Sequence, residues 1–425
     1  MAHAEDRDAC GRARRARPHT SDPDTTGPDK TNPNNTKPNQ RREPVTRHDR
    51  AIHALKKIAV ASAATAAAVA LTAAVTSAPA GAATHKKSPK SVKLTIAKPA
   101  AATISEAGSS LLYPLWNIWV PGYNAKYSQV TIDTAAGGSG AGITGATNGT
   151  LQIGSSDAYL SSSNLAADPT LENIPVAISA QEIYYNVPGV TAHLKLSGKL
   201  LAQIYEGKVT NWSTSAITSL NPGVPLPTLP IVTVHRSDGS GDTFLFTTYL
   251  SDSTKTWATK VGYNTSVTWP AAPGALAASG NSGVVAACKT NKGCIAYVGI
   301  SYQTEALGDG LVYAQLENGK GQYELPTHTS IAAEAAGFAS KTPASGAISM
   351  IDGKVKGGYP IINYEYAIVS KKQSSSTVAK ALRSVLDWAI NPADGNSATY
   401  LSQVNFLSLP PKVADNSFEQ IQAIK

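Results

Sequence analysis

The chain has 425 residues, of which 42% are hydrophobic and 16% charged, enough for a leader and one large or two medium folded units. Its net charge of +8 comes from the N-terminal part, because residues 99–425 contain 19 Lys and Arg against 21 Asp and Glu. Nucleic-acid-binding proteins carry basic clusters on the folded domain, so this distribution excludes that class of partner.

Residues 51–83 have the pattern of a signal peptide. Lys56 and Lys57 precede an alanine-rich apolar run at residues 58–75, and Ala-Gly-Ala at residues 80–82 supplies a cleavage pattern. A transmembrane anchor is the alternative interpretation of the apolar run. The pattern predicts an exported protein.

The segments on either side of this run have a different composition. Residues 1–50 are rich in Arg, Asp, Pro, Asn and Thr, which predicts a disordered extension or a start site assigned too far upstream. Residues 84–98 are rich in lysine and are predicted to form a linker.

Three cysteines occur, and two of them bracket a short loop. Cys10 lies in the leader, whereas Cys288 and Cys294 flank five residues of turn-like sequence. In an exported chain such a pair predicts a disulfide, and two thiols are too few for a structural zinc site.

From residue 103 onward, strand-like and helix-like segments alternate, which predicts an α/β architecture with largely parallel sheets. Apolar and β-branched runs predict strands at residues 130–133, 174–188, 230–234 and 359–369. Ser197 is expected to cap a helix that ends at Gly207, and Ser374 to cap a second helix with Leu382 and Leu386 on its apolar face.

Three loops of small residues each precede a helix-like segment. They are Ala-Gly-Ser-Ser (107–110), Gly-Gly-Ser-Gly-Ala-Gly (137–142) and Asp-Gly-Ser-Gly-Asp (238–242). Glycine lets the backbone approach a ligand, the N–H groups at a helix N-terminus attract anions, and serine hydroxyls add donors. Each loop alone is typical of an ordinary turn, but the three together indicate an oxyanion site.

Arg236 and Arg383 are the only arginines after residue 98. Arg236 lies two residues before the third loop, where a guanidinium can grip a phosphate through two parallel hydrogen bonds. A surface position or pairing with Asp238 is the alternative, and Arg383 is interpreted as a surface residue. We expect Arg236→Ala to weaken ligand binding severely and to leave the melting temperature of the ligand-free protein nearly unchanged.

Asp157 follows a Gly-Ser-Ser turn, and its carboxylate would repel a fully ionised anion. Phosphate carries a proton at neutral pH and sulfate does not. An ionised Asp157 could therefore accept the phosphate O–H and reject sulfate. A helix cap is the alternative role for Asp157, as it is for Asp242.

At these residues the sequence resembles the substrate-binding proteins of high-affinity phosphate ABC transporters. Matching stretches include EAGSSLLYPLW (106–116), AGGSGAGI (136–143), IGSSDAYL (153–160), VHRSDGSGDTF (234–244) and PIINYEYAIV (360–369), in family order. The resemblance implies the two-lobed periplasmic-binding-protein fold of type II, with two mixed or parallel sheets flanked by helices. Two hinge crossings are then expected near residues 180–185 and 359–363. Lobe I would contain residues 99–180 and 362–425, and lobe II residues 181–361.

The resemblance also implies a phosphate site and a role in transport. The implied contacts are Ser110, Leu111 through its backbone N–H, Ser139, Asp157, Arg236, Ser240, Gly241 and Asp242, the last being a threonine in many members. The implied protein is a non-enzymatic monomer without metal or cofactor that delivers inorganic phosphate to the membrane permease subunits of an ABC transporter. Many members carry a lipid-attachment cysteine at the cleavage site; this sequence has none there, which favours secretion or retention at the cell wall.

Other functions fit the sequence less well. The same fold could bind sulfate or molybdate, although Asp157 disfavours a fully deprotonated ligand. A serine hydrolase needs an activated serine with a base, but residues 137–141 lack the last glycine of a nucleophile elbow and the three histidines after residue 98 have no diagnostic spacing. A cell-surface protein with a vestigial site is the remaining alternative.

Overall fold

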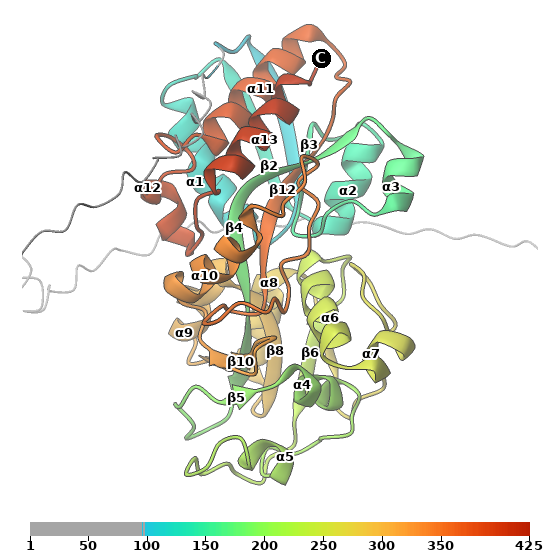
Figure 1. Cartoon of the computed structure of the whole chain (residues 1–425), viewed down its shortest axis with the longest axis vertical. Helices are drawn as coiled ribbons and strands as arrows, with labels where there is room; N and C mark the ends of the chain where they lie inside the picture. Colours follow the sequence, from blue (N-terminus) through green and yellow to red (C-terminus); the bar gives the residue numbers. More distant parts are fainter. Residues whose placement is uncertain (1–95, 97) are drawn as a thin grey trace, which may run out of the picture. The chain divides into compact units, whose positions relative to one another are not determined.

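The computed structural model describes residues 96 and 98–425 (Figure 1). The predicted N-terminal extension, the predicted signal peptide and most of the predicted linker lie outside the described residues. The described part contains two α/β lobes, connected by the long strand β4 (Leu171–Asn186) and by the chain that leads into β12 (Ile362–Ser370). No described helix is both long and apolar enough to cross a membrane.

Lobe I has a central mixed sheet. Strand β1 pairs in parallel with β2 and β3, and β12 runs antiparallel to β3 and β4. Its other strands are β1 (Ala102–Gly108), β2 (Val130–Ala136) and β3 (Ile153–Ser156). Its helices are α1 (Tyr113–Asn124), α2 (Ser139–Thr147), α3 (Ser162–Ala167), α11 (Ser376–Ile390), α12 (Ala398–Leu401), the 3-10 helix η2 (Ser402–Val404) and α13 (Pro411–Gln422).

Lobe II is built around β6 (Val232–Arg236), β7 (Leu276–Ala278), β8 (Cys294–Gly299) and β9 (Val312–Tyr313). A small second sheet contains β5 (Lys195–Leu196), β10 (Gln315–Glu317) and β11 (Tyr323–Glu324). The helices are α4 (Gly198–Tyr205), α5 (Ser215–Thr218), α6 (Gly241–Ser253), α7 (Lys255–Lys260), α8 (Gly280–Thr290), the 3-10 helix η1 (Ile300–Tyr302), α9 (Gln303–Gly308) and α10 (His328–Ala339).

Strand β4 belongs to both lobes. Its residues up to Ala180 pair with β12, and its residues from Gln181 onward pair with β8. The sheets of the two lobes therefore share β4 and form one sheet of nine strands in the described part of the chain. Residues 173–185 of this strand are almost all buried, which explains its continuous apolar sequence. The predicted two-lobed α/β fold is confirmed, but the expectation of largely parallel sheets was wrong, because β4 and β12 run antiparallel to their neighbours.

Helix α1 is held tightly, and it places the first of the three small-residue loops. The rings of Trp116 and Trp119 meet edge to face at 5.2 Å, and both side chains are buried. Trp116 Nε1 donates a hydrogen bond to Ser155 Oγ on β3 at 2.9 Å. The residues just before α1 and just after β3 are therefore fixed relative to each other.

Helix caps and the disulfide test the local predictions. Ser197 Oγ accepts a hydrogen bond from Leu200 N–H at 3.1 Å, so the predicted cap of α4 is confirmed. The cap of α11 is Ser375, whose Oγ accepts from Val378 N–H at 3.2 Å, so the prediction of Ser374 was wrong by one residue. Cys288 and Cys294 form the predicted disulfide, which ties the end of α8 to the start of β8.

Candidate functional site

The three small-residue loops follow the carboxyl ends of strands and open helices, the position where open α/β sheets bind ligands. Strands β1 and β2 are parallel neighbours, so their ends lie at the same edge of the sheet. The N–H groups of Gly137 and Gly138 donate to the carbonyl oxygen of Gly108, at 2.9 and 2.7 Å, which fixes the second loop on the first. The third loop opens α6 in lobe II.

The loops of the two lobes are in direct contact. Gly140 N–H in lobe I donates to the carbonyl oxygen of Gly239 in lobe II at 2.9 Å. A Cβ atom at Gly241 would lie only 2.3 Å from Asp157 Oδ2 and 2.5 Å from Ser139 Oγ. Glycine is therefore required at position 241 for the third loop to approach the other two.

Asp157 lies just after β3, and its side chain is buried at this junction. Its carboxylate accepts a hydrogen bond from Ser109 Oγ, and its backbone N–H donates to Ser139 Oγ at 3.1 Å. Burial, together with the charge of Asp242, raises the pKa of Asp157 to about 7, although Ser109, Glu365 and Arg236 oppose that rise.

Arg236 of lobe II is 4% exposed, and its charge is near enough to lower the pKa of Asp157. Its Nε donates to Asp238 Oδ1 at 2.8 Å, one terminal nitrogen donates to Asp238 Oδ2, and the other donates to Asp242 Oδ2 at 2.7 Å. A guanidinium has five N–H donors, so these contacts leave two. The arginine is thus oriented by two aspartates and keeps donors for a further anionic group.

The carboxylate of Asp242 is occupied by partners within the protein. Besides Arg236, it accepts from Asn281 Nδ2 at 2.7 Å and from Gln181 Nε2 at 3.1 Å. Burial raises the pKa of Asp242, and the charge of Arg236 with the two amide donors opposes this effect. Asp238 has its pKa lowered, because its contacts with Arg236 outweigh its partial burial.

The remaining predicted contacts lie at the same junction. Ser110 Oγ accepts hydrogen bonds from the backbone and side-chain nitrogens of Asn281, at 3.2 and 3.0 Å, across the two lobes. Leu111 is fully buried, and its carbonyl oxygen accepts from Ser301 Oγ of lobe II at 2.7 Å. Ser240 caps α6 through Thr243 N–H. The structure therefore brings together all eight residues that the sequence singled out.

Three residues of this site were not predicted. They are Gln181 on β4, Asn281 at the start of α8 and Glu365 on β12, each fully buried. Asn281 lies in Ser-Gly-Asn-Ser-Gly (279–283), a fourth small-residue loop before a helix, so the criterion used for the other loops would have identified it. No comparable sequence signal exists for Gln181 or Glu365, because both lie inside apolar strands.

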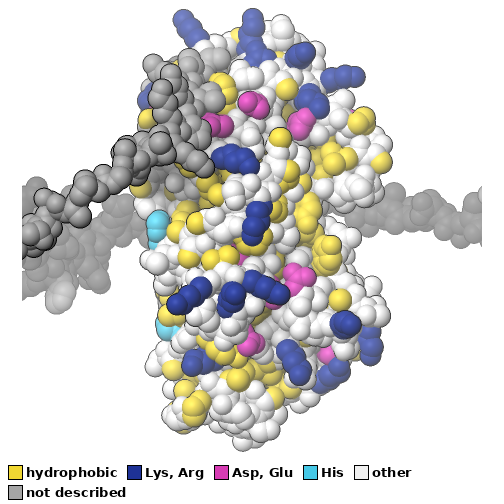
Figure 2. Space-filling model, viewed as in Figure 1, with side chains coloured by type: hydrophobic (Ala, Val, Ile, Leu, Met, Phe, Trp, Pro, Cys, Tyr) yellow, Lys and Arg dark blue, Asp and Glu magenta, His cyan; other side chains and the backbone are white. Residues whose placement is uncertain are grey.

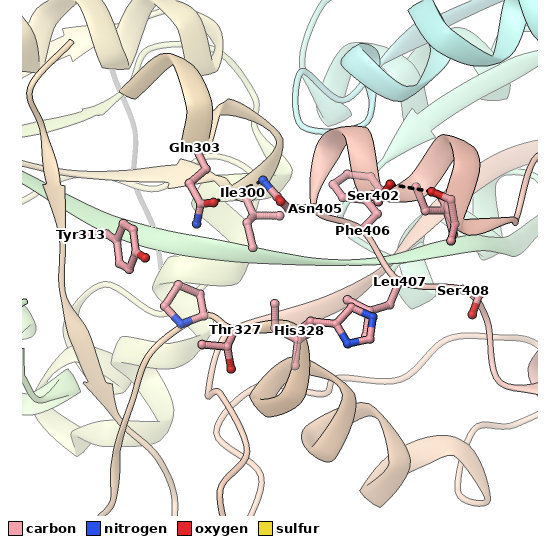
Figure 3. A pocket seen from close by; sticks show the side chains of 14 residues that line it. Ile300, Gln303, Tyr313, Thr327, His328, Ser402, Asn405, Phe406, Leu407 and Ser408 are labelled. Atoms are coloured by element: carbon pink, nitrogen blue, oxygen red, sulfur yellow. Dashed lines mark hydrogen bonds between the residues drawn. The ribbon is translucent and has the colours of Figure 1, made fainter. Parts of the chain in front are cut away.

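A separate cavity of about 390 Å³ lies between the lobes and is shared by α9, the start of α10 and the segment from α12 to residue 408 (Figure 3). Asn405 Nδ2 reaches Gln303 Oε1 across it at 3.4 Å. None of its lining residues belongs to the three loops, and no Lys or Arg lines it. Figure 1 places α9, α10 and α12 on the opposite side of β4 from α2 and α6.

Comparisons with known proteins agree with this arrangement. A model of the PBP superfamily domain matches residues 94–393. The phosphate-binding protein PstS of Xylella fastidiosa is 35% identical over 321 residues, covering 75% of this chain and 84% of that protein. PstS of Pasteurella multocida is 32% identical over 324 residues, covering 76% and 90%. The crystal structure of a phosphate-binding protein from Stenotrophomonas maltophilia has a TM-score of 0.56 at 20% identity, covering 75% of this chain and 94% of that one, which shows a shared fold.

The fold and the matched domain define a two-lobed binding protein of the PBP superfamily. Within it, the chain belongs to the family of PstS phosphate-binding proteins.

Proposed function

We propose that this protein binds inorganic phosphate between its two lobes, outside the cytoplasm, and delivers it to the permease subunits of an ABC importer. One arrangement carries the proposal: a buried carboxylate of lobe I, Asp157, and a buried arginine of lobe II, Arg236, both lie where three glycine- and serine-rich loops meet. An anion that is also a hydrogen-bond donor fits such a pair, and protonated phosphate is one.

The donors for phosphate come from both lobes. We assign the two remaining N–H groups of Arg236, the hydroxyl groups of Ser110, Ser139 and Ser240, and the backbone N–H groups near Leu111 and Gly241. N–H groups in the first turn of a helix have no acceptor within that helix, and α2 and α6 both begin here.

Asp157 is the proposed acceptor for the phosphate O–H. A ligand without a proton would place two acceptors face to face in a buried site, which costs binding free energy. Sulfate and molybdate are disfavoured on this ground. Asp242 has a different proposed role: because its oxygens already accept from Arg236, Asn281 and Gln181, it orients the arginine.

Closure of the lobes around phosphate follows from where these donors lie. We propose that lobe I is residues 99–180 with 362–425, that lobe II is residues 181–361, and that bending occurs where β4 changes partner. A ligand that contacts both lobes binds the closed arrangement better and shifts the equilibrium toward it.

The proposed role is transport without catalysis. The three histidines of the described region have other partners: His235 stacks on Trp269 at 4.8 Å, His193 contacts Tyr313, and His328 lines the separate cavity. On the face shown in Figure 2, Lys and Arg side chains are spread over both lobes. This distribution supports a small-molecule ligand and does not suggest a nucleic-acid surface.

Calorimetric titration of the ligand-stripped protein with phosphate and, separately, with sulfate tests the proposal. We expect tight binding of phosphate and no heat from sulfate at the same concentrations. Comparable binding of both anions would make the protein a general oxyanion binder, and binding of neither would contradict the proposed function.

A further inference from the structure

Glu365 of β12 lies beside Asp157 in the sheet of lobe I. The antiparallel ladder between β3 and β12 pairs Ser156 with Tyr366, so the next position along it places residue 157 opposite residue 365. Asn363 Nδ2 also reaches the carbonyl oxygen of Asp157 at 3.4 Å. The backbone thus places two acidic residues at neighbouring positions: Glu365 within β12 and Asp157 directly after β3.

The two oxygens of Glu365 have different surroundings. Oε1 accepts from Ser179 Oγ at 2.5 Å and from Asn363 Nδ2 at 3.1 Å. Oε2 is buried and receives no hydrogen bond from a donor in the described part of the chain. The carboxyl groups of Glu365 and Asp157 lie close enough for each to shift the pKa of the other.

Two carboxyl groups can form a hydrogen bond only if one of them carries a proton. Glu365 is fully buried, and its pKa is raised well above its ordinary value, first by burial and then by the charge of Asp157. The other titratable groups near the pair are Asp242 and Arg236 from lobe II and Tyr366 on β12.

The surroundings decide which member keeps the proton. Asp157 has the charge of Arg236 nearby and accepts from Ser109 Oγ, and both stabilise its ionised form. Glu365 Oε1 accepts hydrogen bonds only from uncharged donors, which stabilise an ionised carboxyl less than a positive charge does. Its Oε2 has no donor among the described residues and is therefore free to carry a proton.

We propose that Glu365 is a positioning residue that carries a proton on Oε2 and donates it to the Asp157 carboxylate, which keeps Asp157 ionised and aimed at the ligand hydroxyl. This inference rests on the proposed function, since it assigns the support for its acceptor carboxylate. It gives the fully buried acid on β12 a specific role in selecting a protonated anion.

Glu365→Gln and Glu365→Leu separate this role from simple packing. The Gln amide accepts on Oε1 and donates from Nε2 at the position of the proposed proton. We therefore expect Glu365→Gln to bind phosphate within about twofold of the unchanged protein, and Glu365→Leu to bind about tenfold or more weakly. Calorimetry at pH 7 measures both, and thermal unfolding shows that each variant is folded.

Other results would overturn the inference. If Glu365 were ionised, Glu365→Gln would remove a negative charge beside the anion site and tighten binding about tenfold or more. If it served only to fill space, Glu365→Leu would bind like the unchanged protein. Glu334→Gln is the matched control, because Glu334 is a fully buried acid of α10 in lobe II and its substitution should leave affinity unchanged.

A double-mutant cycle tests whether Glu365 acts through Asp157. In an Asp157→Asn background, Glu365→Leu should weaken phosphate binding no further, whereas additive losses would contradict the inference. Failure of the proposed function is a distinct outcome, because the unchanged protein itself would then not bind phosphate.

Discussion

Lobe II places two aspartates, Asp238 and Asp242, on the single guanidinium of Arg236, whereas lobe I places Asp157 beside a second acid, Glu365. The first cluster is compensated by a charge that persists at every physiological pH. The second is compensated by a proton. Lobe II can therefore attract any anion through the permanent charge of Arg236. Lobe I can select an anion that carries a proton, because Asp157 accepts a hydrogen bond from it.

Removal of Arg236 should have the largest effect on phosphate binding and on stability. Arg236→Ala leaves Asp238 and Asp242 without their cation, and uncompensated buried charges of this kind cost about 3–5 kcal/mol. We expect loss of measurable phosphate binding and a clear fall in the melting temperature of the ligand-free protein. The sequence analysis predicted an unchanged melting temperature; because Arg236 is only 4% exposed and holds two aspartates, we now expect the melting temperature to fall.

Arg383→Ala is the control for this experiment. Arg383 donates from a terminal nitrogen to the carbonyl oxygen of Ile424, which belongs to none of the three loops. Its substitution should leave phosphate affinity unchanged. Full stability of Arg236→Ala would contradict the structural role given to the arginine.

The pH dependence of stability should show the buried acids that keep their protons up to near-neutral pH. The pKa of Asp157 is about 7, and burial also raises the pKa of Glu106 to about 7 and that of Glu182 to about 8. Between about pH 4 and 7 the folded protein therefore binds more protons than the unfolded chain, so stability falls as pH rises. Each fully responding group changes the unfolding free energy by about 1.4 kcal/mol per pH unit.

Urea unfolding of the ligand-free protein at pH 5 and pH 8 measures this effect. We expect a higher midpoint at pH 5 than at pH 8. Asp238 behaves oppositely, because its lowered pKa makes its contribution disappear only in more acidic solution. A midpoint that rises toward pH 8 would show that these buried acids are compensated by positive charges, as Asp238 is, and not by protons.

Asp157→Asn has a smaller expected effect on binding and the opposite sign on stability. The amide cannot accept the phosphate O–H as a carboxylate does, and a hydrogen bond to a charged group is worth about 2 kcal/mol. Phosphate should bind tens of times more weakly and sulfate should become a better competitor in calorimetric displacement. The ligand-free protein should be at least as stable, because a buried carboxyl beside Asp242 and Glu365 is gone. Unchanged selectivity would contradict the acceptor role.

The sequence predicts the parts of this molecule that depend on local pattern. The apolar run of β4, the glycines of the loops and the disulfide are each visible within a few residues. Ser374 and Ser375 show the limit of such patterns: both are serines, and only the backbone conformation decides that Ser375 Oγ caps α11.

The network behind the loops could not be predicted in the same way. Glu365 lies in an apolar strand and reaches Asp157 only because β12 returns antiparallel to β3 after some 200 intervening residues. The carboxylate of Asp242 could have bound ligand or protein, and contacts from Arg236 and from two distant residues, Gln181 and Asn281, show that it binds the protein. Sequence alone carries no record of these long-range pairings.

Asn281 connects Asp242 of lobe II to the first loop of lobe I, and its removal should have the smallest effect. Its Nδ2 donates to Ser110 Oγ in lobe I at 3.0 Å and to Asp242 Oδ2 in lobe II at 2.7 Å. Asn281→Ala loses this bridge but leaves the Arg236 contacts with both aspartates. We expect phosphate affinity to fall about fivefold, which corresponds to about 1 kcal/mol.

Asn318→Ala is the matched control, since Asn318 is equally buried but donates to Gly358 O within lobe II. It should reduce stability without changing affinity, whereas Asn281→Ala should change affinity because its contacts cross between the lobes. The radius of gyration of each variant at saturating phosphate, measured by X-ray scattering, adds a test of closure. If both variants lose affinity equally, the contacts of Asn281 across the lobes contribute only to folding.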